Sequence, residues 1–261
     1  MMQRTAVPVP VGLRRWITGI EVASAEPAGE HVLAHVPDGA AALVFRVTAD
    51  QRADLLVAGP RTRASYNVGE PVPLYIRARV RPGRARPLLG TPLNQLTGHV
   101  VPLSQLWGEA ADRLTGELAR LGPRPSAGLI RACIETAVRD RLAVQSRHDL
   151  ARTDLLCAAI DELTPTGRRL EPLPGLARKL AVSERQLRNL FTDGVGVAPK
   201  RLASISRVRY VLAHASRRRW AQLTADCGYY DQSHMAAEFR RHMGTSPQAF
   251  AAGHLPPAQP C

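Results

Sequence analysis

One spaced pattern occurs twice in the last third of this 261-residue chain, and its two copies lie 48 positions apart. Each copy has a helix-capping residue, then an apolar residue, a Phe, a Gly, a Pro and a final large apolar residue at the same intervals. The copies consist of Ser183, Leu187, Phe191, Gly196, Pro199 and Leu202, and of Asp231, Met235, Phe239, Gly244, Pro247 and Phe250. Agreement at six structurally meaningful positions indicates that one supersecondary unit is duplicated.

The second copy lies in a stretch, residues 220–250, that predicts a helix, a tight turn, a second helix and a closing turn. Gly228 is placed to end the first helix, and Asp231 to cap the second. Within the second helix one stripe is apolar and the opposite side is short, polar and basic; the stripe is Met235, Phe239 and Met243. Such a helix suits entry into a groove of DNA.

The sequences LARKLAVSERQLRNLF with GVAP, and CGYYDQSHMAAEFRRHMGTSP, resemble the two halves of the DNA-binding domain of the AraC/XylS family of bacterial transcription regulators. The resemblance covers about the last hundred residues. It implies two helix-turn-helix units, and it places positions 185, 188 and 189 among those that reach bases. Members of the family commonly form homodimers, and RNA polymerase is a further expected partner beside double-stranded DNA.

In the first unit we expect a supporting helix over residues 173–180, a cap at Ser183 and a recognition helix over residues 184–193. Leu187, Leu190 and Phe191 face inward, and the outward side chains are Arg185, Gln186, Arg188 and Asn189. Arg is suited to guanine and Asn to adenine, because each forms two hydrogen bonds to the base edge. These four residues are therefore the predicted base-reading set.

The second recognition helix offers less chemistry for base reading. Gln232 and Ser233 are able to read bases, whereas position 237 is only Ala. Arg240 and Arg241 are candidates for phosphate contacts or for an unpaired surface role, and His234 is equally suited to capping, packing or touching DNA. We expect the first unit to supply most of the direct readout, and the second to contribute phosphate contacts, apolar contacts and register.

Between the units, residues 199–215 predict a helix with apolar residues on one side. Its length of about 25 Å, together with the flanking turns, sets the recognition helices roughly one turn of DNA, ~34 Å, apart. The chain carries a formal net charge of +13. From residue 165 onward there are 15 Lys and Arg against 6 Asp and Glu, a net of +9, which favours DNA binding, although a basic surface also serves solubility.

The N-terminal region has short β-like runs between residues 31 and 80. In the last of them Leu74, Ile76, Ala78 and Val80 alternate with polar residues, which predicts a strand with a buried face and a cationic, solvated face. The Gly- and Pro-spaced segments of this region resemble an uncharacterised N-terminal domain of some AraC-type regulators, in which a Cys often follows the Asp-Gly pair. This chain has Ala40 there.

Two clusters of this region invite a binding role. His31 and His35 lie four apart, with His99 as a distant third ligand, but no acidic or further His companion supports a metal site. The arginines at 77, 79, 81, 84 and 86 are able to line an anion pocket. The sequence favours instead a solvated edge that discourages pairing between sheet edges.

Together these patterns predict an α+β chain: a β-rich sensor domain over residues 1–107, a helical connector over 108–163, the double helix-turn-helix domain over 164–254 and a disordered tail over 255–261. The helices from residue 104 to 163 either form a dimerising bundle or cover the β-domain. Residues 164–174, with three Pro and two Gly nearby, are the expected linker.

Several classes of protein are disfavoured. No segment reads as a signal peptide or a membrane span, so we expect a cytoplasmic protein. The four Cys are far apart, which disfavours a zinc site or disulfide framework. No catalytic constellation is apparent, so we expect no enzyme, no metal and no cofactor. The leading function is a DNA-binding transcription regulator controlled by an unknown small-molecule effector; the alternatives are control by a partner protein, or an enzyme domain addressed to DNA.

Overall fold

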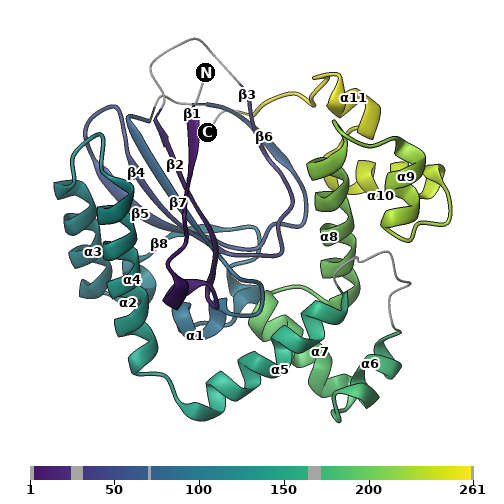
Figure 1. Cartoon of the computed structure of the whole chain (residues 1–261), viewed down its shortest axis with the longest axis horizontal. Helices are drawn as coiled ribbons and strands as arrows, with labels where there is room; N and C mark the ends of the chain where they lie inside the picture. Colours follow the sequence, from purple (N-terminus) through teal and green to yellow (C-terminus); the bar gives the residue numbers. More distant parts are fainter. Residues whose placement is uncertain (1–2, 25–31, 70–71, 164–171, 260–261) are drawn as a thin grey trace.

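The computed structural model describes residues 3–24, 32–69, 72–163 and 172–259, and it has the α+β architecture expected from the sequence (Figure 1). Six strands pair antiparallel in the order β1-β2-β7-β4-β5-β8. Two more, β3 (Val32–His35) and β6 (Ser65–Val68), form a separate antiparallel pair. The strands of the main sheet are β1 Gln3–Val7, β2 Ile17–Ser24, β4 Ala42–Val47, β5 Ala53–Ala58, β7 Leu74–Val80 and β8 Val100–Pro102.

Strand β7 lies inside the sheet, between β2 and β4. Its apolar residues are all buried, which confirms the predicted alternation. The prediction of a solvated cationic face is wrong, because Arg77 and Arg79 are about three-quarters buried and pair with the buried Asp38. Arg209 of the C-terminal region approaches the same carboxylate, with 3.1 Å between its Nη1 and Oδ2 of Asp38. The cationic face is therefore covered by the C-terminal half of the chain.

Helices α3 and α4 cover the other side of the sheet (Figure 1) and share its hydrophobic core through Leu114, Leu118, Ile134 and Val138. Gly108, with φ of 55°, separates α2 from α3. The helical elements of this half are η1 Val11–Leu13, α1 Ala85–Leu89, η2 Leu93–Gln95, α2 Ser104–Trp107, α3 Glu109–Arg120, α4 Ala127–Ala143 and α5 Arg147–Leu163.

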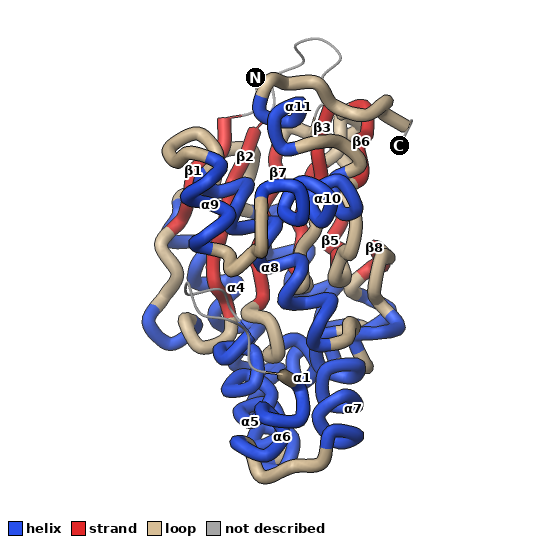
Figure 2. Tube along the Cα trace, turned by 90° about the vertical axis from the view of Figure 1, so that its right-hand side faces the viewer, coloured by secondary structure: helices blue, strands red, loops and turns tan. Residues whose placement is uncertain are grey.

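The remaining helices form two hydrophobic cores, and the long helix α8 contributes residues to both. Figure 2 shows α8 between α9 and α10 above it and α5, α6 and α7 below it. Leu202 and Ala203 of α8 belong to the first core, and Val208 and Val211 belong to the second. The elements are α6 Leu173–Lys179, α7 Glu184–Val195, α8 Pro199–His214, α9 Trp220–Asp226, α10 Gln232–Met243 and α11 Pro247–Ala251. The helix, turn and helix order predicted for both copies is thus present.

The predicted connector divides between two cores. Helices α3 and α4 pack on the sheet, whereas α5 packs with α6 and α7 through Leu156, Ala159, Ile160 and Leu163. Of the predicted linker, residues 164–171 lie outside the described residues, and α6 already begins at Leu173. Helix α5 therefore completes the hydrophobic core of the first helix-turn-helix unit.

The tail also differs from the prediction of disorder. Gln259 pairs in parallel with Asn67 of β6, and its N–H donates to the carbonyl of Tyr66 at 2.8 Å. The N–H of Val68 in turn donates to the carbonyl of Gln259 at 3.2 Å. Through these backbone hydrogen bonds, the described end of the chain pairs with β6 of the β3–β6 pair.

Because α5 completes the first core, a fragment of residues 147–261 is expected to be more stable than one of residues 165–261. Truncating one buried Leu or Ile side chain typically costs about 2–5 kcal/mol, and the shorter fragment lacks several of them. Thermal unfolding followed by circular dichroism checks this expectation. Identical unfolding midpoints for the two fragments would show that α5 is dispensable for the first unit.

Candidate nucleic-acid interface

The first unit begins its second helix, α7, with a capping box at Ser183. The Ser183 hydroxyl accepts a hydrogen bond from the Gln186 N–H at 3.1 Å, and the Gln186 side-chain oxygen accepts one from the Ser183 N–H at 2.8 Å. This arrangement satisfies free N–H groups at the helix start. Gln186, predicted to face DNA, thus has a structural task at the exposed end of the helix.

The outward side of α7 carries the predicted polar residues. Leu187, Leu190 and Phe191 are buried beneath it, as predicted. Arg185, Arg188 and Asn189 are exposed, but Arg188 forms an ion pair with Glu184 one turn earlier. Among the described residues, no hydrogen bond or ion pair holds the side chains of Arg185 and Asn189, and these two are the most available for base contact.

In the second unit, Gly228 has a φ of 68° in the turn after α9, and Asp231 caps α10 by accepting from the His234 N–H at 2.7 Å. The ring of His234 packs edge-on against Tyr229, with centroids 5.4 Å apart. The structure therefore gives the His234 ring a packing contact, one of the roles considered from the sequence, whereas the cap itself is Asp231. The predicted contact residues Gln232, Ser233, His234, Arg240 and Arg241 are all exposed on α10.

A largely buried network that sequence reasoning missed fixes α10 to α8. Arg207 donates two hydrogen bonds to Glu238, at 2.9 and 2.7 Å, and the Tyr229 hydroxyl donates a third at 2.7 Å. Burial tends to raise the pKa of Glu238, but the hydrogen bonds from Arg207 and Tyr229 and the Arg207 charge hold this pKa below its usual value. Glu238 is therefore charged, and the orientation of the second recognition helix is fixed from behind.

The turns of the two units differ in length. Supporting helices α6 and α9 end at Lys179 and Asp226, which are 47 positions apart, whereas the caps Ser183 and Asp231 are 48 apart. The second turn is therefore one residue longer. In the shorter turn Ala181 has a φ of 53°, a left-handed conformation that favours glycine.

Further exposed cations surround the second unit. Arg217 and Arg219 are exposed beside the start of α9, and Tyr230 in the following turn is 93% exposed. Arg218 of the same run pairs with Asp226. In the sequence these cations stand out as three consecutive arginines before Trp220.

Residues 176–253, which contain both units, match the family described as a helix-turn-helix domain. This region is an AraC-type helix-turn-helix domain. The protein is accordingly a DNA-binding transcription regulator, as the sequence predicted. No curated protein matches the chain.

Among solved structures, an AraC-type transcriptional regulator from Chromobacterium violaceum is 20% identical, covers 42% of this chain and 99% of its own, and has a TM-score of 0.36. ToxT from Vibrio cholerae is 9% identical over 95% of this chain and 97% of its own, with a TM-score of 0.43. A second ToxT structure from Vibrio cholerae, with unsaturated fatty acid bound, is 11% identical over 95% of this chain and 94% of its own, with a TM-score of 0.40. These similarities are weak.

The sequence raised the possibility of a metal site in the N-terminal region and predicted no membrane span. His31 lies outside the described residues, and His35 and His99 are exposed. Among the residues that the structure describes, no group of three or more His, Cys, Asp or Glu side chains is placed to hold a metal ion. Likewise, within the described segments no helix has the length and apolar character needed to cross a membrane.

The Ala181→Gly variant is expected to be more stable than the wild type by about 1 kcal/mol, since glycine adopts positive φ without the steric cost of Cβ. Chemical denaturation measures the difference. The control is Ala213→Gly at an exposed position within α8, which is expected to cost about 1 kcal/mol. Equal destabilisation by both variants would contradict the strain assigned to this turn.

Replacing Arg185 and Asn189 together by Ala is expected to abolish preference for the operator, because each bidentate base contact supplies about 1–3 kcal/mol of discrimination. General, salt-sensitive DNA binding should remain, since it depends on phosphate contacts. Fluorescence anisotropy with operator and random duplexes tests this, and Arg120→Ala on the exposed surface of α3 controls for the loss of charge. Unchanged operator preference in the double variant would refute the contact assignment.

Proposed function

We propose that the two units read successive major grooves on one face of a duplex, and that the N-terminal half controls them in response to a small molecule. The observation that carries the proposal is that the N-terminal half contacts both recognition helices at corresponding ends. In this arrangement Arg185, Arg188 and Asn189 contact bases, with Gln186 at the rim. Gln232 and Ser233 contribute to reading, and His234, Arg240 and Arg241 lie toward the phosphates.

The length of α8 supports reading of two grooves. Its 16 residues make a rod of about 24 Å, and the turns at each end add to the separation of the recognition helices. Recognition helices with centres about 34 Å apart match one turn of B-form DNA. One chain would then contact an asymmetric site with two unlike halves, because the exposed faces of α7 and α10 carry different residues.

The first recognition helix is held at its C-terminal end by the segment that follows η2. Gly196 ends α7 with a φ of 83°, and the Thr97 hydroxyl donates to its carbonyl at 3.0 Å. A Cβ at position 196 would lie 2.6 Å from the carbonyl oxygen of Leu93, so glycine is required for this close approach. The first unit is thus docked on the N-terminal half through its helix end.

The second recognition helix is held in the corresponding place by β6 and the loop before it. The buried Tyr66 hydroxyl donates to the carbonyl of Met243 at 2.7 Å, and the Ala64 N–H donates to the carbonyl of His242 at 2.7 Å. His242 is itself buried, with Nδ1 2.6 Å from the Thr62 carbonyl and Nε2 2.7 Å from the Ser204 hydroxyl. Burial lowers the pKa of His242, so the neutral ring donates through Nδ1 and accepts from Ser204.

These two docking contacts provide a route for control. A shift of the N-terminal half in response to a ligand would alter the relative positions of the two recognition helices, and operator affinity depends on that spacing. The same route would serve a partner protein in place of a ligand, which is the alternative function. Homodimerisation and contact with RNA polymerase, expected from the family resemblance, are part of this proposal, and so is a cytoplasmic location.

The test is quantitative binding of the full-length protein to the DNA upstream of its own and adjacent genes, across a salt series. Saturable binding far tighter than to random DNA is expected. The double variant Tyr66→Phe with Thr97→Val removes only the two docking hydroxyls, each worth about 1 kcal/mol. Its operator affinity should move toward that of the fragment of residues 147–261.

Two outcomes would count against the proposal. If the full-length protein prefers no upstream segment over random DNA, sequence-specific regulation is refuted for those genes. If the docking variant binds the operator as the wild type does while the fragment differs, the two hydroxyl contacts do not transmit control. A response to a bound protein but to no small molecule would favour the partner-controlled alternative.

A further inference from the structure

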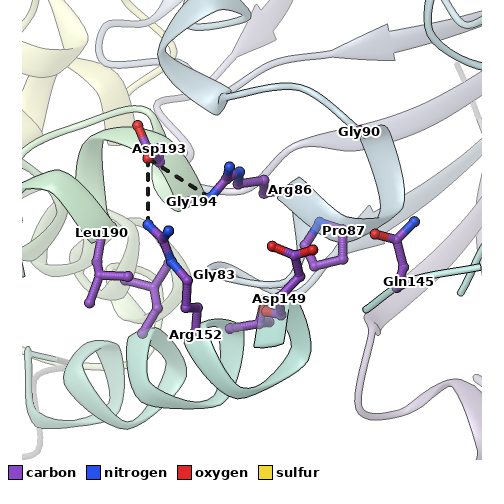
Figure 3. A pocket seen from close by; sticks show the side chains of 12 residues that line it. Gly83, Arg86, Pro87, Gly90, Gln145, Asp149, Arg152, Leu190, Asp193 and Gly194 are labelled. Atoms are coloured by element: carbon purple, nitrogen blue, oxygen red, sulfur yellow. Dashed lines mark hydrogen bonds and ion pairs between the residues drawn. The ribbon is translucent and has the colours of Figure 1, made fainter. Parts of the chain in front are cut away.

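A cavity of about 140 Å³ lies where three parts of the chain meet (Figure 3). Its walls come from α1 of the N-terminal half, from the beginning of α5 and from the C-terminal half of the recognition helix α7. Its volume suits a small molecule of only several non-hydrogen atoms, similar to a cavity known to accept benzene. The cavity therefore connects the N-terminal half to the unit that carries most of the predicted base-reading residues.

Two arginines from different elements converge at one side of this cavity. Arg86 of α1 and Arg152 of α5 both turn toward Asp193 of α7 in Figure 3, and each has a guanidinium nitrogen 3.8 Å from Oδ2 of Asp193. This separation is too long for a hydrogen bond, and all three side chains are more than one-third exposed. Such pairs contribute little to stability, so both guanidinium groups retain donors for an anion.

Acceptors lie at the other side of the cavity. The Ser146 hydroxyl donates to the Asp149 carboxylate at 2.6 Å; this hydrogen bond, with the charges of Arg86 and Arg152, holds the pKa of Asp149 below its usual value. The Gln145 amide nitrogen donates to the Arg141 carbonyl at 3.2 Å, which leaves its side-chain oxygen as an acceptor. Figure 3 shows Asp149 and Gln145 to the right of the two guanidinium groups. A hydroxyl or amino group would be satisfied there.

We propose that this cavity binds a small polar metabolite with a carboxylate or phosphate at one end and a hydroxyl or amino group at the other. The anionic end contacts Arg86 and Arg152, and the donor end contacts Asp149 and Gln145. Pro87, Leu156 and Leu190 supply the apolar wall around the short body of the ligand.

Occupation of the cavity is coupled to α7, because the anion and Asp193 compete for the same two arginines. Asp193 lies one helical turn after Asn189 on the recognition helix. Displacing its carboxylate releases a tie between α7 and the helices α1 and α5. This coupling rests on the proposed function, whereas the binding site itself does not.

The experiment is isothermal titration of the full-length protein, without DNA and at constant ionic strength, with four probes: inorganic phosphate, glycerol 3-phosphate, lactate and serine. Saturable binding of at least one probe is expected. Comparing the affinities of the two phosphate compounds with those of the two carboxylates identifies the anionic group that the site prefers. Comparing the affinity of phosphate with that of glycerol 3-phosphate tests whether the hydroxyl end of the ligand contributes to binding. Binding of none of the four overturns the site.

Three variants locate the binding. Arg86→Gln with Arg152→Gln should weaken the bound probe at least tenfold, and Asp193→Asn should tighten it severalfold because the competing charge is removed. Arg113→Gln is the matched control, since its side chain is exposed on α3 and, among the described residues, pairs only with the exposed Glu109. Equal affinity in the double variant and the wild type overturns the assignment, and an unchanged affinity in Asp193→Asn overturns the competition.

Operator binding measured in parallel separates the two proposals. If the protein binds DNA specifically but binds none of the probes, the proposed cavity site is refuted and the proposed function stands. If a probe binds the wild type but not the double arginine variant, and the protein has no operator preference, the binding site is supported and the proposed function is refuted.

Discussion

The buried carboxylate of Asp38 is the interaction on which the joining of the two halves depends. Arg79 donates to both of its oxygens, at 2.8 and 2.6 Å, and Arg209 of α8 lies 3.1 Å away. Burial opposes ionisation of Asp38, but the hydrogen bond and charge of Arg79 and the charge of Arg209 hold its pKa below the usual value. Its stabilising effect is therefore complete above the unfolded pKa of about 3.9, and is lost as the pH falls through the lower folded value.

The neighbour of Asp38 explains how closely α8 approaches. A Cβ at Gly39 would lie 2.2 Å from Cδ1 of Leu202, a residue in the first core of the DNA-binding half. The Arg209 guanidinium also donates to the carbonyl of Pro37 at 3.2 Å. Because α8 carries hydrophobic residues of both helix-turn-helix cores, fixing α8 on this turn positions both units relative to the sheet. The Thr97 and Tyr66 contacts then fix the ends of the two recognition helices individually.

What the sequence predicted and what it missed follow from the range of the interactions. Caps, left-handed glycines and apolar stripes depend on residues a few positions apart, so Ser183, Asp231, Gly228 and Phe239 were placed correctly. The face of β7 was misjudged because the partners of Asp38 lie 41 and 171 positions along the chain, at Arg79 and Arg209. No local pattern reveals such pairs.

The same reasoning applies to the candidate site. Exposure of Arg185 and Asn189 could be predicted, since it follows from the helical period and the buried stripe beneath them. The capping task of Gln186 was available in the sequence as a Ser followed three positions later by Gln. By contrast, the network of Arg207, Tyr229 and Glu238 joins α8, a turn and α10, and only the fold brings these three residues together.

The two units share one fold but are fixed by unlike interactions. The second is held by buried hydrogen bonds from Tyr66 and around His242, which are costly to break without replacement partners. The first has Asp193 in long, half-exposed ion pairs beside a cavity, and such pairs are readily exchanged for other ions. On the proposed control, therefore, the second unit maintains register on DNA, and the first, which carries Arg185 and Asn189, is the unit whose placement a ligand adjusts.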